Sequence, residues 1–188
     1  QDKIDEAQVK LNELAPYKAA ALAIAVGFGT DSSVDDAQAA FEANAEAFGI
    51  SLEQYNKLTP AQKTAGIEIL KAALAPFAAN FEDYIRETND VEEIKAFGDF
   101  IEDAIEVYAN SEIARAAVEA LFDGDLLAVG VDQAAIDNAQ ALLDEVTNYD
   151  GDGWHAGQLK DLIPTLVAGL QDKIDEAQVK LNELAPYK

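Results

Sequence analysis

The sequence predicts an all-α protein, a multi-helix bundle module with a long helix connecting tandem modules, and three observations support this. Residues 1–18, QDKIDEAQVKLNELAPYK, recur without a change as residues 171–188. Apolar side chains follow helical spacing of three and four residues along most of the chain. Capping residues precede these stripes, and strand-type alternation is confined to residues 126–131. We therefore expect roughly seven or eight helices.

The duplication defines the domain organisation. The copies begin at residues 1 and 171, so residues 1–170 form one period and residues 171–188 begin the next. Perfect identity indicates either an array of recently homogenised modules or a deliberate duplication by an engineer, since an old repeat accumulates substitutions. No Gly/Ser spacer separates the second copy from residue 170, which precedes it. We therefore favour a natural array, in which the partners of each module are neighbouring identical modules.

Composition restricts the classes of chemistry that are open to the chain. One period is long enough, and at 49% hydrophobic residues apolar enough, to bury a core without disulfides. The absence of Cys excludes thiol catalysis and Cys-ligated zinc. The longest apolar run, residues 19–26, is mostly Ala and too short to span a membrane.

The charge is strongly acidic, with a formal net value of −23. Residues 96–159 contain fourteen acidic side chains and one basic side chain, Arg115. Nucleic acid and anionic membranes are therefore not expected as partners. One interpretation is a solvated face that keeps a concentrated polymer soluble. The other is dependence on calcium or high salt, typical of seawater, brine or a cell surface.

The first predicted helix covers the first copy and continues to a C-terminal stop signal, Gly27-Phe28-Gly29. Pro16 is expected to bend this helix before its Ala-rich continuation. The apolar stripe of the helix consists of Ile4, Ala7, Leu11 and Leu14.

Caps predict the following helices. Ser33 precedes a helix over residues 34–48, and Ser51 with Gln54 forms a capping box for a short helix to about residue 58. Thr59 and Pro60 open the next helix, in which Pro76 is a candidate break.

Three further helices are predicted after residue 89. Asp90 is expected to cap residues 91–109, Ser111 a helix to residue 122, and Asp132 residues 133–147.

The second copy is expected to lie on one long amphipathic helix. Its apolar stripe extends upstream to Leu159, which predicts a helix over residues 158–185, about 40 Å long at 1.5 Å per residue. Pro164 is expected to kink it or mark a restart. We expect this helix to project from the bundle into the next module, whereas the first copy leads into its own bundle.

Part of the chain is similar to a known kind of module. The stretch FGISLEQYNKLTPAQKTAGIEILKAAL, residues 48–74, with the preceding helix from Val34, resembles in layout the three-helix modules of bacterial surface proteins, including the albumin-binding kind. The likeness lies in the turn at residues 49–51 and in the positions of Tyr55 and Leu58. The resemblance implies a bacterial surface protein and carries no binding residue with it.

One loop carries candidate metal chemistry. Residues 148–154, NYDGDGW, place oxygen side chains at positions 1, 3 and 5 and Gly at position 6, and so resemble the first half of an EF-hand or dockerin calcium loop. Position 12 is Leu159, where such loops carry an acid. A shifted loop that uses Asp161, or a ligand from another segment such as Asp123 or Asp125, would then complete the shell. A plain Asp-Gly turn remains the alternative. The candidate Ca²⁺ ligands are Asn148, Asp150, Asp152, the Trp154 carbonyl and Asp161.

Catalysis is not expected. The one histidine, His155, is interpreted as a loop or N-cap residue, and three of the four serines resemble caps or their neighbours. Adjacent acids such as Asp35 and Asp36 splay apart on a helix, so they cannot share a proton or bridge a metal.

The expected function is that of a structural spacer or adhesive tandem-repeat module in a long extracellular or cell-surface filament or adhesin, with calcium stiffening its joints. One alternative is a small-molecule or lipid carrier module that uses a Phe- and Ala-lined interior. Another is an engineered helix duplication, in which the extra helix fills a groove vacated by its twin. Both copies packed side by side in one closed bundle would favour the engineered alternative.

Overall fold

The computed structural model describes residues 2–152 and 156–187. It is 77% helical, which confirms the predicted all-α class. The chain divides into two compact units, Gln1–Ile105 and Glu106–Lys188, and each is described by itself. No helix in the described part of the chain is long and apolar enough to cross a lipid bilayer.

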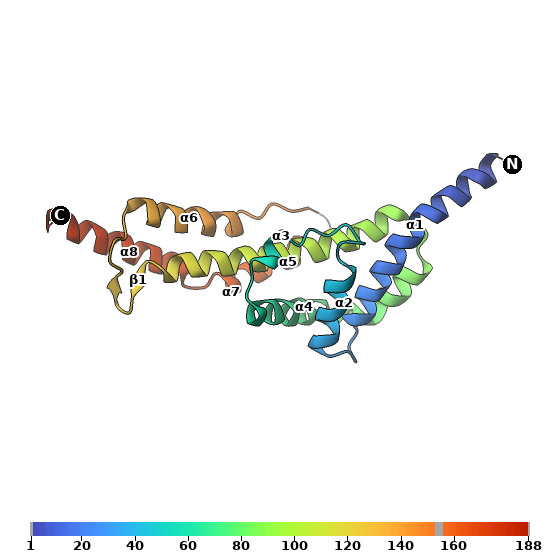
Figure 1. Ribbon diagram of the computed structural model, residues 1–188, viewed down its shortest axis with the longest axis horizontal. Coiled ribbons are helices and arrows are strands. Elements are labelled where there is room, and N and C mark those ends of the chain that lie inside the picture. Colours follow the sequence, from blue (N-terminus) through green and yellow to red (C-terminus); the bar gives the residue numbers. More distant parts are fainter. Residues whose placement is uncertain (1, 153–155, 188) are drawn as a thin grey trace. The chain divides into compact units, whose positions relative to one another are not determined.

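The first unit contains four helices and the start of a fifth. They are α1 (Asp2–Gly27), α2 (Val34–Asn44), α3 (Glu53–Asn56), α4 (Pro60–Glu87) and the first part of α5 (Val91–Glu119). α1, α2 and α4 pack against one another, and the first turns of α1 extend beyond α2 (Figure 1). α1 and α2 approach closely because Gly27 has no side chain: a Cβ there would lie 2.4 Å from the Ala40 Cβ.

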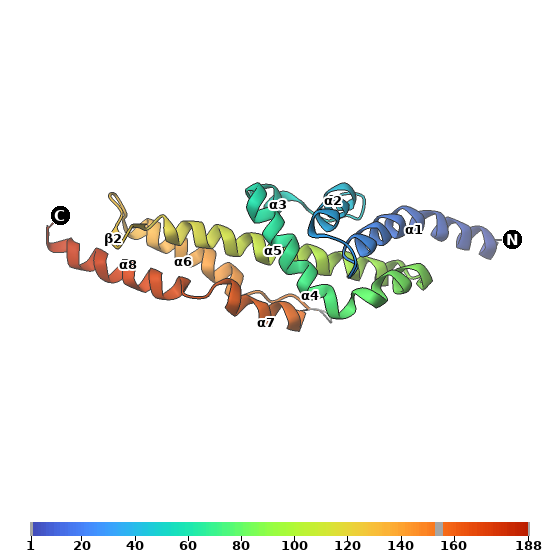
Figure 2. The same cartoon turned by 90° about the horizontal axis from the view of Figure 1, so that it is seen from below.

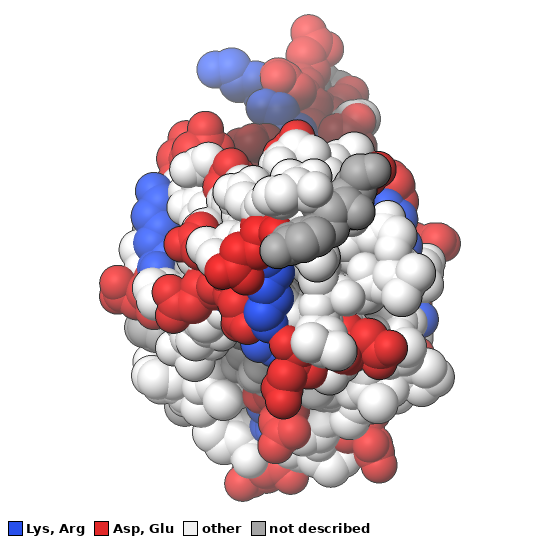
Figure 3. Space-filling view, turned by 90° about the vertical axis from the view of Figure 1, so that its left-hand side faces the viewer, with Lys and Arg blue, Asp and Glu red and all other residues white. Residues whose placement is uncertain are grey.

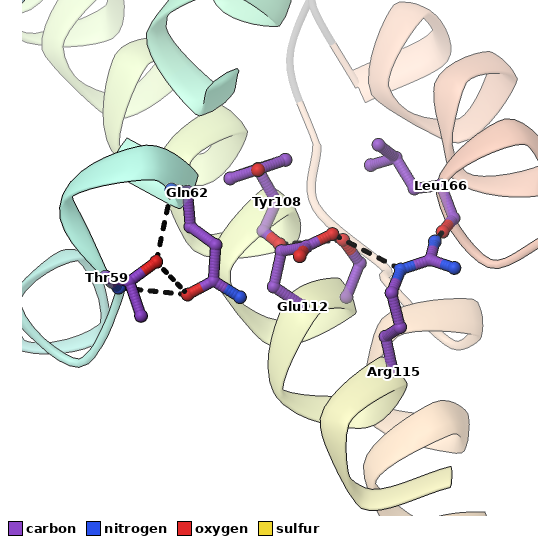
Figure 4. Close-up of polar contacts among 7 residues, drawn as sticks. Thr59, Gln62, Tyr108, Glu112, Arg115 and Leu166 are labelled. Atoms are coloured by element: carbon purple, nitrogen blue, oxygen red, sulfur yellow. Dashed lines mark hydrogen bonds and ion pairs between the residues drawn. The ribbon is translucent and has the colours of Figure 1, made fainter. Parts of the chain in front are cut away.

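Three of the predicted caps in and around this unit are confirmed. The Ser33 hydroxyl accepts a hydrogen bond from the Asp36 N–H at 3.1 Å, and the Asp36 carboxylate accepts one from the Ser33 N–H at 3.1 Å. Thr59 and Gln62 form the same reciprocal box, drawn in Figure 4. The Glu92 N–H donates to the Asp90 carboxylate at 2.9 Å. Local capping chemistry therefore fixes where α2, α4 and α5 begin.

The predicted capping box at Ser51 is wrong. α3 begins at Glu53, and its N-cap, Leu52, makes no side-chain capping bond. The Ser51 hydroxyl accepts from the Glu53 N–H at 3.4 Å but forms no reciprocal box with Gln54. The Ser51 N–H donates instead to the Glu102 carboxylate on α5 at 3.0 Å. A long-range carboxylate therefore replaces Gln54 as the partner of the Ser51 N–H. The preceding helix also stops earlier than predicted, at Asn44.

The predicted helix boundary at Ser111 is wrong as well. α5 is continuous from Val91 to Glu119 and passes from the first unit into the second. Ser111 is fully buried within it, and its hydroxyl donates to the Tyr108 carbonyl one turn back at 2.7 Å. No Gly or Pro interrupts residues 99–119, so nothing in the backbone forces the helix to end there.

The second unit is built on the end of α5. It adds a short hairpin of β1 (Phe122–Asp123) and β2 (Leu126–Leu127), followed by α6 (Gln133–Thr147), α7 (Ala156–Leu166), α8 (Leu170–Leu184) and a final 3-10 turn, η1 (Ala185–Tyr187). The cap at Asp132 is confirmed, because its carboxylate accepts from the Ala135 N–H at 3.0 Å. α6 and α8 lie side by side in both ribbon views (Figures 1 and 2).

The predicted single helix over residues 158–185 is wrong. α7 ends at Leu166, two residues after Pro164, and α8 starts at Leu170. Gly169 between them has φ +76°, a left-handed conformation that a residue with a Cβ adopts only at a cost. α8 does not project from the unit, because it packs into the core of the unit through Leu170, Ile174 and Ala177.

Candidate functional site

The two copies of the repeated segment are helical but lie in different environments. The first copy opens α1 in the first unit, and the second forms α8 in the second unit. Ile4 is 73% exposed, whereas its counterpart Ile174 is 3% exposed. Ala7 is exposed as well, and its counterpart Ala177 is fully buried.

At the other end of the segment the difference is reversed. Leu14 is 3% exposed in the first copy, and Leu184 is 43% exposed in the second. The Lys18 amine also donates to the Thr88 carbonyl at 2.6 Å, which anchors this end of the first copy to the first unit. Each copy therefore buries a different part of the same apolar stripe: the first copy its last residue, Leu14, and the second copy its first residues, Ile174 and Ala177.

The groove that holds the second copy is made by α5 and α6. Its apolar residues are Ala114, Val118, Leu121, Val131, Ile136, Ala139 and Leu143. Two glutamine pairs border it: Gln133 with Gln178, and Gln140 with Gln171, each joined by two amide hydrogen bonds of 2.7 to 3.0 Å. The order of these pairs shows that α6 and α8 are antiparallel. We call the two glutamine pairs, which lie at the two ends of the apolar contact, the polar clamps.

Lys180 joins the second copy to the hairpin. Its amine donates to the Asp125 carbonyl, lies 5.2 Å from the centre of the Phe122 ring, and forms an ion pair with Glu176 at 2.6 Å. The Lys180 side chain is 25% exposed, compared with 72% for its counterpart Lys10. The same lysine is therefore engaged in one copy and largely solvated in the other.

The first copy borders an open groove in the first unit. This groove, with a volume of about 900 Å³, lies between α1 and the turn that joins α4 to α5. Lys10, Leu11 and Leu14 line one side of it, and Thr88 and Val91 belong to the other. Leu11 is 49% exposed there, so the apolar stripe continues from the free surface into the groove.

Arg115, the one basic side chain within residues 96–159, has a structural role that the sequence analysis missed (Figure 4). Its guanidinium donates to the Leu166 carbonyl at 2.5 Å and lies 3.4 Å from the Glu112 carboxylate. A cation on the last carbonyl of α7 stabilises the C-terminus of that helix. Burial and the nearby Glu112 charge raise the pKa of Tyr108, and the Arg115 charge opposes this rise.

Four of the five predicted calcium ligands lie in the part of the chain that the structure describes. Asn148 is the C-cap of α6, and Asp150, Asp152 and Asp161 are exposed. Trp154 lies outside the described residues, as do Gly153 and His155. Within residues 2–152 and 156–187, no group of three or more His, Asp or Glu side chains could hold a metal ion. Calcium binding at this loop therefore stays a prediction.

A lysine already lies at this loop. The Lys160 amine donates to the Gly151 carbonyl at 3.4 Å and lies 6.0 Å from the centre of the Tyr149 ring. The Tyr149 ring covers Gly151 closely, because a Cβ at that glycine would meet the tyrosine oxygen at 2.1 Å. These contacts also agree with the alternative to calcium binding, a plain polar turn between two helices.

Acidic side chains are spread over the face drawn in Figure 3, among uncharged ones and a few lysines and arginines.

No protein family, characterised protein or solved structure matches this chain at a significant level.

The aromatic side chains of the first unit pack against one another. Phe41 and Tyr55 meet edge to face with ring centres 5.1 Å apart, and Phe48 lies 6.1 Å from Phe97. The Tyr55 hydroxyl donates to the Glu42 carboxylate at 2.7 Å, and burial together with this bond raises the pKa of Tyr55. These contacts are those of a filled core rather than of a ligand cavity.

Proposed function

We propose that the chain is one period of a tandem array of helical modules, which acts as a structural spacer in a long extracellular or cell-surface filament or adhesin. The observation that carries the proposal is the complementary use of the repeated helix. One copy buries Leu14 and leaves Ile4 exposed, and the other buries Ile174 and leaves Leu184 exposed. In an array, one helix would satisfy both surfaces, with its first half in one module and its second half in the next.

Two further observations support an array over an engineered complementation. The copies belong to different units, whereas complementation predicts both copies side by side in one bundle. The outer face of the helix is also the same in both copies, since Val9 is 55% exposed and Val179 is 56% exposed. The inner stripe and the polar residues that flank it change their environment, whereas the outer face does not, as expected of a helix that joins two modules.

The setting and the non-catalytic role rest on the sequence. A net charge of −23 keeps a concentrated filament soluble and disfavours nucleic acid and anionic membranes as partners. The likeness of residues 34–74 to modules of bacterial surface proteins points to the cell exterior. A packed aromatic core agrees better with a spacer than with a carrier of small molecules or lipids.

The array is tested with a chain in which residues 1–170 are followed directly by residues 1–188, which contains three copies of the repeated helix. Because the native chain has no Cys, single cysteines report burial cleanly through their rate of thiol labelling. We expect slow labelling in the middle copy at both the Ile4 and the Leu14 positions. The outer copies should each label fast at one of these positions.

A cysteine at the Val9 position is the matched control and should label fast in all three copies. Small-angle X-ray scattering of chains with one, two and three periods should show the maximum dimension growing in equal steps. A middle copy that labels fast at both positions would contradict the shared helix. Slow labelling at both positions of the middle copy, together with a maximum dimension that does not grow with the number of periods, would support the shared helix but contradict the spacer role.

We also propose that calcium stiffens the loop that follows α6. Asp150 and Asp152 would supply carboxylates, so calcium is expected to raise the thermal unfolding temperature of the second unit. By mass action the gain is about 2.7 kcal/mol at a hundredfold excess over the dissociation constant. Asp150→Ala and Asp152→Ala should abolish the rise, and Glu68→Ala, an exposed acid in the first unit, should keep it. Identical melting curves with calcium and with chelator would leave only the polar turn.

A further inference from the structure

The first turns of α1 carry an apolar surface that nothing in the described residues of the first unit covers. Ile4 is 73% exposed and Leu11 49%, and Ala7 is exposed between them. These three residues lie on one face because they are three and four positions apart. We call this face the α1 stripe. An apolar face of this kind on a helix is usually covered by a partner.

The same chain shows what fits this stripe. Ile174, Ala177 and Leu181 are the identical residues of α8, and they pack into the groove between α5 and α6. The groove is thus known to accept this sequence, in this helical form, with its polar clamps in register. We propose that the α1 stripe of one chain docks into the α5–α6 groove of a second copy of the chain, and that separate chains join in this way.

The polar residues around the stripe match the groove as well as the apolar ones do. Gln178 pairs with Gln133 on α6, and Gln8 stands at the same place beside the α1 stripe. Lys180 donates to the Asp125 carbonyl of the hairpin and lies over the Phe122 ring. Lys10 is 72% exposed and pairs with Glu6 as Lys180 pairs with Glu176, so it can make the same contacts with the Asp125 and Phe122 of the second copy.

Docking would also bring two exposed apolar features together. The hairpin lies beside Lys180 in the second unit, and its Leu126 is 73% exposed. In the first unit, Lys10 lines the open groove that also contains Leu11 and Leu14. Lys10 and Lys180 are the same residue of the repeat. When the α1 stripe docks, the hairpin of the second copy is therefore expected to lie next to Lys10, beside the open groove of the first unit. Leu126 then has an apolar surface to cover.

The α8 of each chain competes with this docking. It belongs to the same unit as the groove and is joined to α7 by a short turn, residues 167–169, so its effective concentration at its own groove is high. The unmodified chain is therefore expected to be a monomer in dilute solution. A groove that has lost its own α8 should be open to the α1 stripe of another chain. This inference rests on the proposed array for its biological role, but it concerns contacts between separate chains.

The test uses full-length chains in defined mixtures. The double variant Ile4→Asp/Ile174→Asp has an open groove and no intact stripe, because the buried charge at position 174 expels α8. The unmodified chain has a filled groove and an intact stripe. Mixed together they should form a 1:1 complex in analytical ultracentrifugation, although neither associates alone. Ile174→Asp by itself has both surfaces and should form head-to-tail oligomers.

Matched controls isolate the stripe. Ile4→Asp mixed with the double variant should give no complex, whereas Val9→Asp, on the outer face at 55% exposure, should give the same complex as the unmodified chain. Hydrogen exchange of α6 amides in the double variant should slow when the unmodified chain is added. This holds whether the second unit of the double variant is folded or unfolded beforehand. Because both chains are strongly acidic, the complex should tighten as salt is raised.

A folding failure does not leave the question open. If Ile174→Asp precipitates, Ile174→Ala replaces it, and the unmodified stripe should then displace the weakened α8 at least about 30-fold more readily than in the unmodified chain. No complex and no protection of α6 in either background would overturn trans docking. The labelling pattern of the chain with three copies tests the array independently. Failure of docking between separate chains can therefore be distinguished from failure of the array.

Discussion

Replacing Ile174 with alanine is expected to lower the free energy of unfolding of the Glu106–Lys188 unit by about 2 to 4 kcal/mol, because it leaves a cavity in a packed core. The same change at Ile4 is expected to cost less than about 0.5 kcal/mol, since that side chain is 73% exposed. Urea unfolding, followed by hydrogen exchange at α6 amides for Ile174 and at α2 amides for Ile4, measures both values.

The comparison is unusually well controlled because the neighbouring residues in sequence are identical. The three residues before each isoleucine and the fourteen after it are the same, so their intrinsic helix propensities and side-chain charges are matched and the difference reports mainly tertiary burial. A second pair completes the test: Leu14→Ala should be the costly change, and Leu184→Ala, at 43% exposure, the mild one. Equal losses at Ile4 and Ile174 would refute the different environments of the two copies.

The next largest effect is expected at Gly27. An added methyl group would lie 2.4 Å from the Ala40 Cβ and 3.4 Å from the Asp36 carbonyl oxygen, so α1 and α2 would have to move apart. Gly27→Ala should therefore destabilise the first unit by about 1 to 3 kcal/mol, in spite of the better helix propensity of alanine. Chemical denaturation followed by far-UV circular dichroism measures the loss.

Gly157→Ala is the matched control. It also lies in a helix, α7, but a Cβ there meets nothing within 4 Å. We expect it to stabilise the second unit by about 0.5 kcal/mol, as alanine restricts the unfolded chain and favours the helix. A loss at Gly157 as large as that at Gly27 would show that the effect at Gly27 is not steric contact between helices.

The sequence located the helices best where local chemistry fixes their ends. The caps at Ser33, Thr59 and Asp132 were predicted and are present, because each is a hydrogen bond within three residues. Ser51 and Ser111 are also serines, but Ser51 forms no capping box with Gln54 and Ser111 caps no helix. Ser51 is held by Glu102 from another helix, and Ser111 is buried inside α5.

The break between α7 and α8 was missed for the opposite reason. An unbroken apolar stripe predicted one helix through residues 158–185, and the stripe is real. The chain nevertheless turns at Gly169, where φ is +76°, and Arg115 from α5 holds the last carbonyl of α7. Periodicity reports which side chains are buried, but it does not report whether the helix that carries them is continuous.

The sequence by itself determined the all-α class, the position of the repeat and the strongly acidic character, because composition, spacing and identity are local properties. It could not determine the environments of the two copies. Ile4 and Ile174 have identical neighbours within the repeated segment, so no rule applied to that segment can distinguish them. Tertiary structure decided the difference: the α5–α6 groove buries the first half of one copy, and the first unit buries Leu14 of the other. Burial depends on which surface reaches a side chain, and that surface comes from residues distant in sequence.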